Sequence, residues 1–210
     1  MPPEPDSSDP ASSPIIVLAS ASPRRREILS RLGLSFRQFS PSILEIGPDL
    51  ARLDARRLVE TLALRKAASY SPAGPEPHLV IGCDTLVFLG NETLGKPESR
   101  DRARDYLLRL SSREHLVMSG LAVRHIRTDR ERVLSDTATT RVRFRALSRD
   151  EIDAYLDGDE WVDKAGAYAI QGAAGNFVEA IQGDYDNVVG LPVSLLDCLV
   201  GRLGLQLLPR

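Results

Sequence analysis

Two short apolar runs rich in β-branched residues constrain the fold of this chain more than any other feature. Ile15 to Ala19 read IIVLA, and Leu79 to Gly90 read LVIGCDTLVFLG. Runs of this length between turn-forming residues are typical of strands buried in a sheet. Segments with helical spacing lie between and after these runs, so we expect buried strands that are covered by helices.

Further helices and strands are expected along the chain. Apolar spacing and capping residues indicate helices over about 23–33, 54–70, 99–111, 148–157 and 192–204. Strands are expected over 34–44, leading into a loop, and in a hairpin of 115–126 and 132–147. Ala55, Leu58 and Leu62 are expected on the inner face of the second helix. Because hairpins are interspersed among the helices, we expect a mixed α/β domain rather than a purely parallel sheet.

Composition narrows the function classes. Residues 1–13 are rich in proline, serine and acidic residues and lack signal-peptide regions, so we expect a disordered tail before a single domain over 14–210. No apolar run approaches the roughly 20 residues that cross a bilayer. The 27 basic and 29 acidic residues nearly balance, which argues against a nucleic-acid binder. Cys83 and Cys198 have no metal-ligand spacing and fit a cytoplasmic protein.

The first expected helix breaks a local electrostatic rule. Ser22 and Pro23 are typical of a helix start, and the first turn then holds three consecutive arginines, Arg24, Arg25 and Arg26. Cations are disfavoured at the positive end of a helix dipole, so a bound anion such as phosphate would explain them. The alternative is that these arginines are solvated surface residues, paired with Glu27 or Glu60.

Asp84 is a second anomaly, because it interrupts the apolar strand VIGCDTLVF. An unpaired carboxylate is costly to bury, so Asp84 is a candidate to bind a divalent metal or to accept a proton from water. Three structural alternatives compete: a turn cap, a pair with a buried base, or a position where the strand leaves the core. Thr85 adds a hydroxyl beside it.

Two later segments carry further polar candidates. Lys96 in LGKP follows a turn and is one candidate. The alternative is an exposed loop lysine without a ligand. The segment is not a P-loop, because the required glycine spacing is missing. In DKAGAYAIQG, Asp163 to Gly172, the glycines allow close approach to a ligand, and Gln171 could read the edge of a base. An irregular loop without a ligand would also tolerate these glycines.

Together these motifs resemble those of the Maf proteins, nucleoside triphosphate pyrophosphatases that are also described as septum formation inhibitors. The matching motifs, in family order, are LASASPRRREIL, GCDT with LGKP, LSRDEI, DKAGAYAIQG and NFVEAIQGDYDNVVGLP. They span Ile15 to Leu195. Agreement of several motifs over nearly the whole domain is far more specific than any one of them.

The resemblance implies a fold and an activity. It implies a two-lobed α/β fold with an elongated central sheet, flanking helices and a cleft, related to the inosine triphosphate pyrophosphatases. It also implies hydrolysis between the α and β phosphates of a nucleoside triphosphate, dependent on Mg²⁺ or Mn²⁺, in a house-cleaning role. The segment DKAGAYAIQG is similar to the branch that acts on dTTP and UTP. A homodimer also fits the resemblance.

The resemblance assigns roles by position. Asp84 matches the catalytic proton acceptor, and the positions tied to substrate choice are Arg24, Thr85 and Gln171. Further polar positions of the cleft are Ser22, Arg25, Glu45, Lys66, Lys96 and Lys164. We expect the metal at Asp84 with Glu45 as the second carboxylate, and Gln171 and Thr85 facing the base. Arg24, Arg25 and backbone N–H groups near Ser22 would hold phosphate oxygens, and Lys96 and Lys164 would assist the departing pyrophosphate.

The sequence also departs from the family pattern. Cys83 stands where the family often has alanine, and Met118 to Gly120 read MSG where a threonine–glycine pair is commoner. Neither change removes a charged group. The main alternative function is a non-catalytic regulator of cell division that binds nucleotide or protein, and a different preferred nucleotide is a further alternative.

Overall fold

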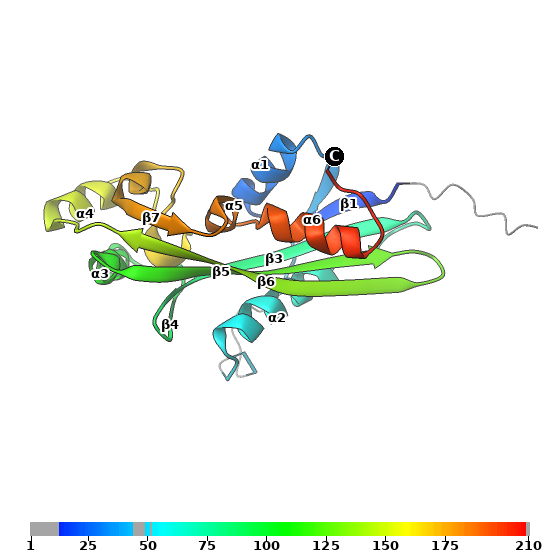
Figure 1. Cartoon of the computed structure of the whole chain (residues 1–210), viewed down its shortest axis with the longest axis horizontal. Helices are drawn as coiled ribbons and strands as arrows, with labels where there is room; N and C mark the ends of the chain where they lie inside the picture. Colours follow the sequence, from blue (N-terminus) through cyan, green and yellow to red (C-terminus); the bar gives the residue numbers. More distant parts are fainter. Residues whose placement is uncertain (1–12, 44–48, 51, 209–210) are drawn as a thin grey trace, which may run out of the picture.

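The computed structural model describes residues 13–43, 49–50 and 52–208. Within them, seven strands form one sheet in the order β2-β1-β3-β5-β6-β7, and β4 pairs with β3 (Figure 1). Strand β1 runs parallel to β2 and β3, whereas β3, β5, β6 and β7 pair antiparallel in succession. The mixed, elongated α/β sheet expected from the sequence is therefore confirmed.

Most of the expected helices and strands are present, although the strand expected over 34–44 is observed only over Phe36–Phe39. The strands are β1 Ile15–Ala19, β2 Phe36–Phe39, β3 His78–Leu89, β4 Glu92–Leu94, β5 Glu114–Ile126, β6 Glu131–Phe144 and β7 Val178–Gln182. The α-helices are α1 Pro23–Arg31, α2 Ala55–Ala68, α3 Arg100–Leu110, α4 Arg149–Leu156, α5 Tyr185–Val189 and α6 Val193–Arg202. Two short 3-10 helices, η1 Ala165–Ala167 and η2 Ala173–Phe177, lie between α4 and β7.

Helices cover both faces of the sheet. Helix α2 lies on one face, and α1, α5 and α6 lie on the other (Figure 1). The larger core lies on the second face, where Ile28 of α1 and Leu199 of α6 pack in the same cluster as Ile81 of β3. A smaller cluster lies under α2 and includes Ala63 and Val80. Alternate residues of each central strand thus serve two cores.

Two strand glycines let α2 approach the sheet very closely. A Cβ at Gly82 would lie 2.4 Å from the Ala63 carbonyl oxygen, and one at Gly120 would lie 2.0 Å from the Val59 carbonyl oxygen. Any side chain at these positions would therefore push the helix away. The close approach fixes where the side chains of α2 point.

The expected inner face of α2 was only partly right. Leu62 is buried, but the fully buried positions also include Val59 and Ala63, and Leu58 and Ala55 are only partly covered. The reason is the close backbone approach at the two glycines, which selects small side chains for the contact. Leu58 instead lines the pocket that is described below.

Other expectations are confirmed or lie outside the described residues. The capping box of Ser148 and Glu151 is present, and the long hairpin of β5 and β6 forms. The sequence reading did not find β4, β7 or α5. The division into a tail and a single domain over 14–210 stays a prediction, since residues 1–12 are outside the described part. Within that part, no helix has the length and apolar character needed to span a membrane.

Candidate active site

The site lies where one parallel strand stops and its neighbour continues. Strand β1 pairs with β3 only as far as Ala19 opposite Gly82, and β4 begins to pair with β3 at Val87. Among the described strands, none pairs with residues 83–86 on that edge of β3. The carboxyl end of a parallel strand is a common place for a ligand, and a pocket of about 890 Å³ opens there.

The pocket gathers the residues predicted from the sequence. All of the expected site residues in the described part line it: Ser22, Arg24, Arg25, Lys66, Asp84, Thr85, Lys96, Lys164 and Gln171. Glu45 lies outside the described residues. The pocket also has an apolar wall that includes Leu58 and Leu62 of α2, Leu86 of β3 and Ile170. It combines polar groups for a charged ligand with apolar surface, as small-molecule sites do.

Asp84 pairs with a lysine on the covering helix. The Lys66 ammonium donates a hydrogen bond to Oδ1 of Asp84, and the two side chains are only 8% and 9% exposed. Strand alternation points Asp84 toward α2, while Cys83 and Thr85 point to the opposite face, toward Gly190. Within the described residues, the second carboxylate oxygen of Asp84 accepts no hydrogen bond. Asp84 is therefore a buried carboxylate. One of its oxygens is held by the Lys66 ammonium, and the other is available to a ligand or a water.

Arg25 is buried and anchored by neutral groups. Its Nε donates to the Gly190 carbonyl at 2.8 Å, Nη1 to Oγ of Ser20 at 2.9 Å, and Nη2 to Oγ1 of Thr85 at 3.1 Å. The residue is 7% exposed, and no carboxylate in the described part of the chain pairs with it. A guanidinium has five N–H donors, so three hold Arg25 in place and two remain for a ligand. A buried cation of this kind is stabilised by an incoming anion.

Arg24 is held in a related way, and its neighbour Arg26 is not. The Nε of Arg24 donates to the carbonyl of Val189 at 3.1 Å, so α1 is tied to the C-terminal end of α5. Carbonyls at a helix C-terminus carry partial negative charge, which offsets arginines at the start of another helix. Burial, and then the charge of Arg25, lower the pKa of Arg24. Arg26 is exposed, so the solvated interpretation holds for one arginine of the three.

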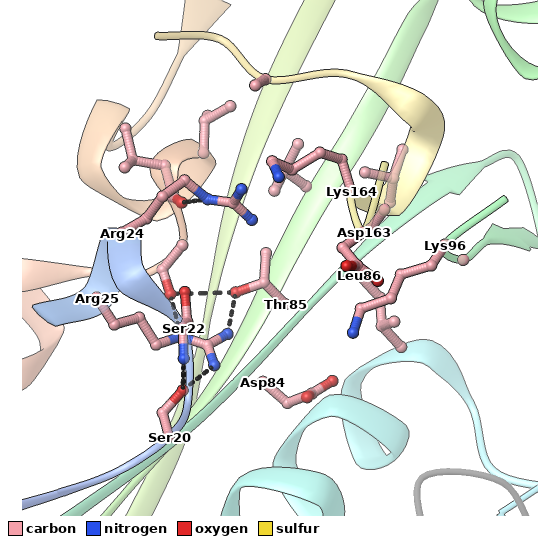
Figure 2. A pocket seen from close by; sticks show the side chains of 18 of the residues that line it. Ser20, Ser22, Arg24, Arg25, Asp84, Thr85, Leu86, Lys96, Asp163 and Lys164 are labelled. Atoms are coloured by element: carbon pink, nitrogen blue, oxygen red, sulfur yellow. Dashed lines mark hydrogen bonds between the residues drawn. The ribbon is translucent and has the colours of Figure 1, made fainter. Parts of the chain in front are cut away.

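The segment that carries Lys164 and Gln171 forms the opposite wall. Figure 2 shows the Lys164 side chain beside the Arg24 guanidinium, and Lys96 lines the same pocket as Asp84. The pKa of Lys164 is lowered, first by burial and then by the charge of Arg24. Lys96 and Gln171 are exposed within the pocket lining. Cations from three distant segments therefore face one space, where an anion would relieve their repulsion.

The backbone of this segment is unusual. Asp163 and Ala167 have φ values of 58° and 62°, and Gly166 between them has φ 70°. Non-glycine residues in the left-handed region are uncommon, and they cluster at functional sites. A Cβ at Gly166 would lie 3.1 Å from both methyl groups of Val87, so glycine also lets the segment pack on β3. Within this segment, the Lys164 ammonium donates a hydrogen bond to the Val162 carbonyl at 3.0 Å, which sets its direction.

Ser22 and Thr85 make hydrogen bonds that the sequence did not predict. Ser22 is the N-cap of α1 with Pro23 after it, as expected, but its side chain makes no capping hydrogen bond. The Ser22 N–H donates to Oγ of Ser20 at 3.2 Å, so it is already engaged. The Thr85 hydroxyl contacts Arg25, Ser119 and the Gly190 carbonyl.

Three residues with a part in the site were not found from the sequence. Ser20 holds Arg25, and Ser119 lies 2.7 Å from Oγ1 of Thr85. Asn187 is fully buried and donates to the Val117 carbonyl and to Oγ1 of Thr140, both at 3.0 Å, which fixes α5 against the sheet. Serine and asparagine within the segments LASAS, MSG and DNVVG were the available signal, but only tertiary contacts reveal their partners.

The donor set fits a metal that the substrate completes. In the stretches 13–43, 49–50 and 52–208, no group of three or more His, Cys, Asp and Glu side chains is placed to hold a metal ion. Asp84 nevertheless offers a carboxylate oxygen to the pocket, beside cations suited to phosphates. Mg²⁺ is usually held by one or two carboxylates plus substrate phosphates, so these residues fit such an ion.

The sequence matches a known family and many relatives that are named dTTP/UTP pyrophosphatase. The family model described as Maf-like protein matches residues 15–203. A dTTP/UTP pyrophosphatase of Thermoanaerobacter sp. (strain X514) is 43% identical over 194 residues, covering 92% of this chain and 99% of the relative. Another from Clostridioides difficile (strain 630) is 44% identical over 187 residues, covering 89% and 94%. A third, from Alkaliphilus oremlandii (strain OhILAs), is 46% identical over 179 residues, covering 85% and 90%.

Proposed function

This chain belongs to the family of Maf-like proteins, and from that membership we propose that it hydrolyses nucleoside triphosphates to the monophosphate and pyrophosphate. Its preferred substrates are dTTP and UTP, the nucleotides in the names of its relatives from Thermoanaerobacter and Clostridioides difficile. The protein is a hydrolase acting on a phosphoanhydride bond. A house-cleaning role follows from removing such nucleotides from the pool.

One observation supports this proposal above all. Arg25 is buried and is held by a carbonyl and two hydroxyls, Arg24 is half-buried and is held by a carbonyl, and both face the same pocket as the buried carboxylate of Asp84. Neutral anchors orient the guanidinium groups and leave their positive charge for a ligand. A triphosphate would supply the missing negative charge, and the Asp84 carboxylate in the same pocket could accept a proton during its hydrolysis.

The chemistry is the addition of water across the α–β anhydride bond. The water oxygen bonds to phosphorus, the bridging oxygen leaves with pyrophosphate, and the water proton passes to the free carboxylate oxygen of Asp84. The Lys66 ammonium holds the other carboxylate oxygen, which keeps Asp84 oriented. Arg24 and Arg25 bind phosphate oxygens, and Lys96 and Lys164 neutralise charge that builds on the leaving pyrophosphate.

A divalent metal belongs to this proposal. Beside Asp84, the substrate phosphates would hold Mg²⁺ or Mn²⁺, which would polarise phosphoryl oxygens and lower the pKa of a water. Glu45 stays the predicted second carboxylate. All other positioning is done by the basic side chains described above.

Base choice is assigned to the wall opposite α1. Gln171 lies exposed in the pocket lining, next to Ile170, and an amide offers both a donor and acceptors to a base edge. The apolar surface of Leu58, Leu62 and Leu86 completes a place for a planar ring. These features suit a pyrimidine held by few polar contacts.

The remaining predictions concern the location, the oligomeric state and the partners of the protein. Cys83 and Cys198 are free thiols, which supports a cytoplasmic location. The homodimer stays a prediction. Nucleic-acid binding stays disfavoured by the nearly balanced charge, with 27 basic and 29 acidic residues.

The deciding experiment measures pyrophosphate release from dTTP, UTP, CTP, the purine triphosphates and 7-methyl-GTP, with Mg²⁺, with Mn²⁺ and with chelator. Metal-dependent release that favours dTTP and UTP supports every part of the proposal. Preference for another base keeps the mechanism and overturns the substrate assignment. If folded protein releases pyrophosphate from none of these nucleotides, the proposed enzymatic activity is wrong, and a nucleotide-binding regulator is favoured.

A further inference from the structure

We propose that Ser119 is a positioning residue, which acts through Thr85 to fix the direction of Arg25 in the pocket. The inference rests on the proposed function, since it assigns Arg25 to phosphate binding. It concerns a residue of β5 that contacts Arg25 only through Thr85.

The two hydroxyls meet because of strand register. Thr85 of β3 lies directly opposite Ser119 of β5, so both side chains stand on the same face of the sheet. Their oxygens are 2.7 Å apart, and Ser119 is completely buried. Within the described part of the chain, Thr85 is the only side-chain partner of the Ser119 hydroxyl.

Counting donors gives the direction of each hydrogen bond. Arg25 has donors only, so its Nη2 must donate to Oγ1 of Thr85. The Thr85 hydroxyl has one hydrogen, and the Gly190 carbonyl, 3.3 Å away, can only accept. Ser119 therefore donates to Thr85, and Thr85 donates to Gly190. The relay runs from Ser119 through Thr85 to the same carbonyl that holds Nε of Arg25.

This arrangement assigns Thr85 an indirect role. Its oxygen accepts two hydrogen bonds and its hydrogen is donated, so the hydroxyl has no capacity left for a ligand. Its effect on the reaction passes through the guanidinium of Arg25. Ser119 polarises and orients this hydroxyl, which in turn keeps Nη2 of Arg25 pointing at one acceptor. The two remaining N–H groups of Arg25 then have a fixed direction toward the pocket.

The test compares variants that remove or keep each oxygen. Ser119→Ala and Thr85→Val remove a hydroxyl, whereas Ser119→Thr and Thr85→Ser keep one. We expect kcat/KM for dTTP to fall about 10-fold in Ser119→Ala, as for the loss of one neutral hydrogen bond, and to recover in Ser119→Thr. Ser135→Ala is the matched control. It removes the hydroxyl of a half-buried serine of β6, which donates a hydrogen bond to Glu60 away from the pocket.

A double-mutant cycle separates positioning from a general structural effect. In a Thr85→Val background, and equally in an Arg25→Lys background, Ser119→Ala should cause no further loss, because the relay is already broken. Full additivity in both backgrounds overturns the proposal. So does a Ser119→Ala variant that loses thermal stability but keeps wild-type kcat/KM.

A binding measurement distinguishes failure of this inference from failure of the proposed function. If wild-type protein releases no pyrophosphate, the same variants are compared by calorimetric binding of a dTTP analogue with a non-hydrolysable α–β bridge. Weaker binding in Ser119→Ala that Ser119→Thr restores then supports the relay without turnover. Equal binding by both variants overturns it.

Discussion

The ammonium of Lys66 donates a hydrogen bond to the carboxylate of Asp84 across the interface between α2 and β3, where both side chains are buried. One of the sequence-based alternatives for Asp84 was a pair with a buried base, and that pair exists. It does not replace the functional interpretation, because the pair lines the pocket together with the arginines of α1. A buried carboxylate is retained most readily when a cation lies beside it.

Replacing Asp84 with asparagine tests the proton acceptor. The amide keeps an oxygen for Lys66, so we expect the fold to be retained while turnover falls at least about 100-fold. Pyrophosphate release and a thermal melt on the same sample check both parts. A folded variant with near-normal turnover would remove Asp84 from the chemistry.

Replacing Lys66 with methionine tests the ion pair. The change removes the ammonium beside a buried carboxylate, and breaking a buried pair costs about 3 to 5 kcal/mol. We expect the free energy of unfolding in urea to fall by that order. The double variant Lys66→Met with Asp84→Leu should recover much of this stability yet remain inactive; if the double variant is no more stable, the pair is not what stabilises this interface.

The three arginines of α1 offer a matched comparison. Arg24 lines the pocket and is bonded to Val189, whereas Arg26 is exposed on the same helix. We expect Arg24→Ala to lower kcat/KM for a triphosphate about 10- to 100-fold, as for loss of charge-assisted hydrogen bonds. Arg26→Ala should change it less than about twofold. Equal effects of the two changes in steady-state assays would return Arg24 to the solvated interpretation.

Gln171 is expected to govern base choice. Leucine in its place removes the amide that we assign to base recognition and leaves apolar volume of similar size. We expect the preference for UTP over CTP, measured as a ratio of kcat/KM values, to fall about 10-fold. Turnover at saturating substrate should change little, and an unaltered ratio would assign base choice to other residues.

His115 predicts an acid-sensitive fold. Its ring is buried against Phe144, and Nε2 lies 2.9 Å from the Tyr168 hydroxyl. Burial lowers the pKa of His115 to about 4. The unfolded chain takes up a proton on this residue below pH 6.5, whereas the folded chain does so only near pH 4. Stability is therefore lost as the pH falls through that interval, by about 3 kcal/mol at most.

His115→Phe provides the comparison, because it keeps an aromatic ring in the cluster. We expect the unfolding free energy of the wild type to fall relative to that of His115→Phe as the pH falls from 6.5 to 4, since phenylalanine cannot be protonated. Parallel pH curves for the two proteins would contradict a neutral, buried His115.

Sequence alone determined the main elements and most of the polar residues that line the pocket. The apolar runs of β1 and β3, the capping box at Ser148 and the alternation along β6 specify local structure, because strand and helix periods are written into side-chain spacing. Charge placed against local rules, at Arg24 and at Asp84, marked the site for the same reason. A residue that violates its local preference needs a compensating partner.

Tertiary structure decided how these residues cooperate. No spacing rule reveals that Gly82 and Gly120 let α2 settle onto the sheet, which sets the direction of Lys66 toward Asp84. Nor does it reveal that Ser119 faces Thr85, since strand register depends on pairing between distant segments. The ends of β1 and β4 on β3 open the pocket, and those ends are fixed by which backbones pair. Local preference thus selected the groups, while long-range packing gave them their partners.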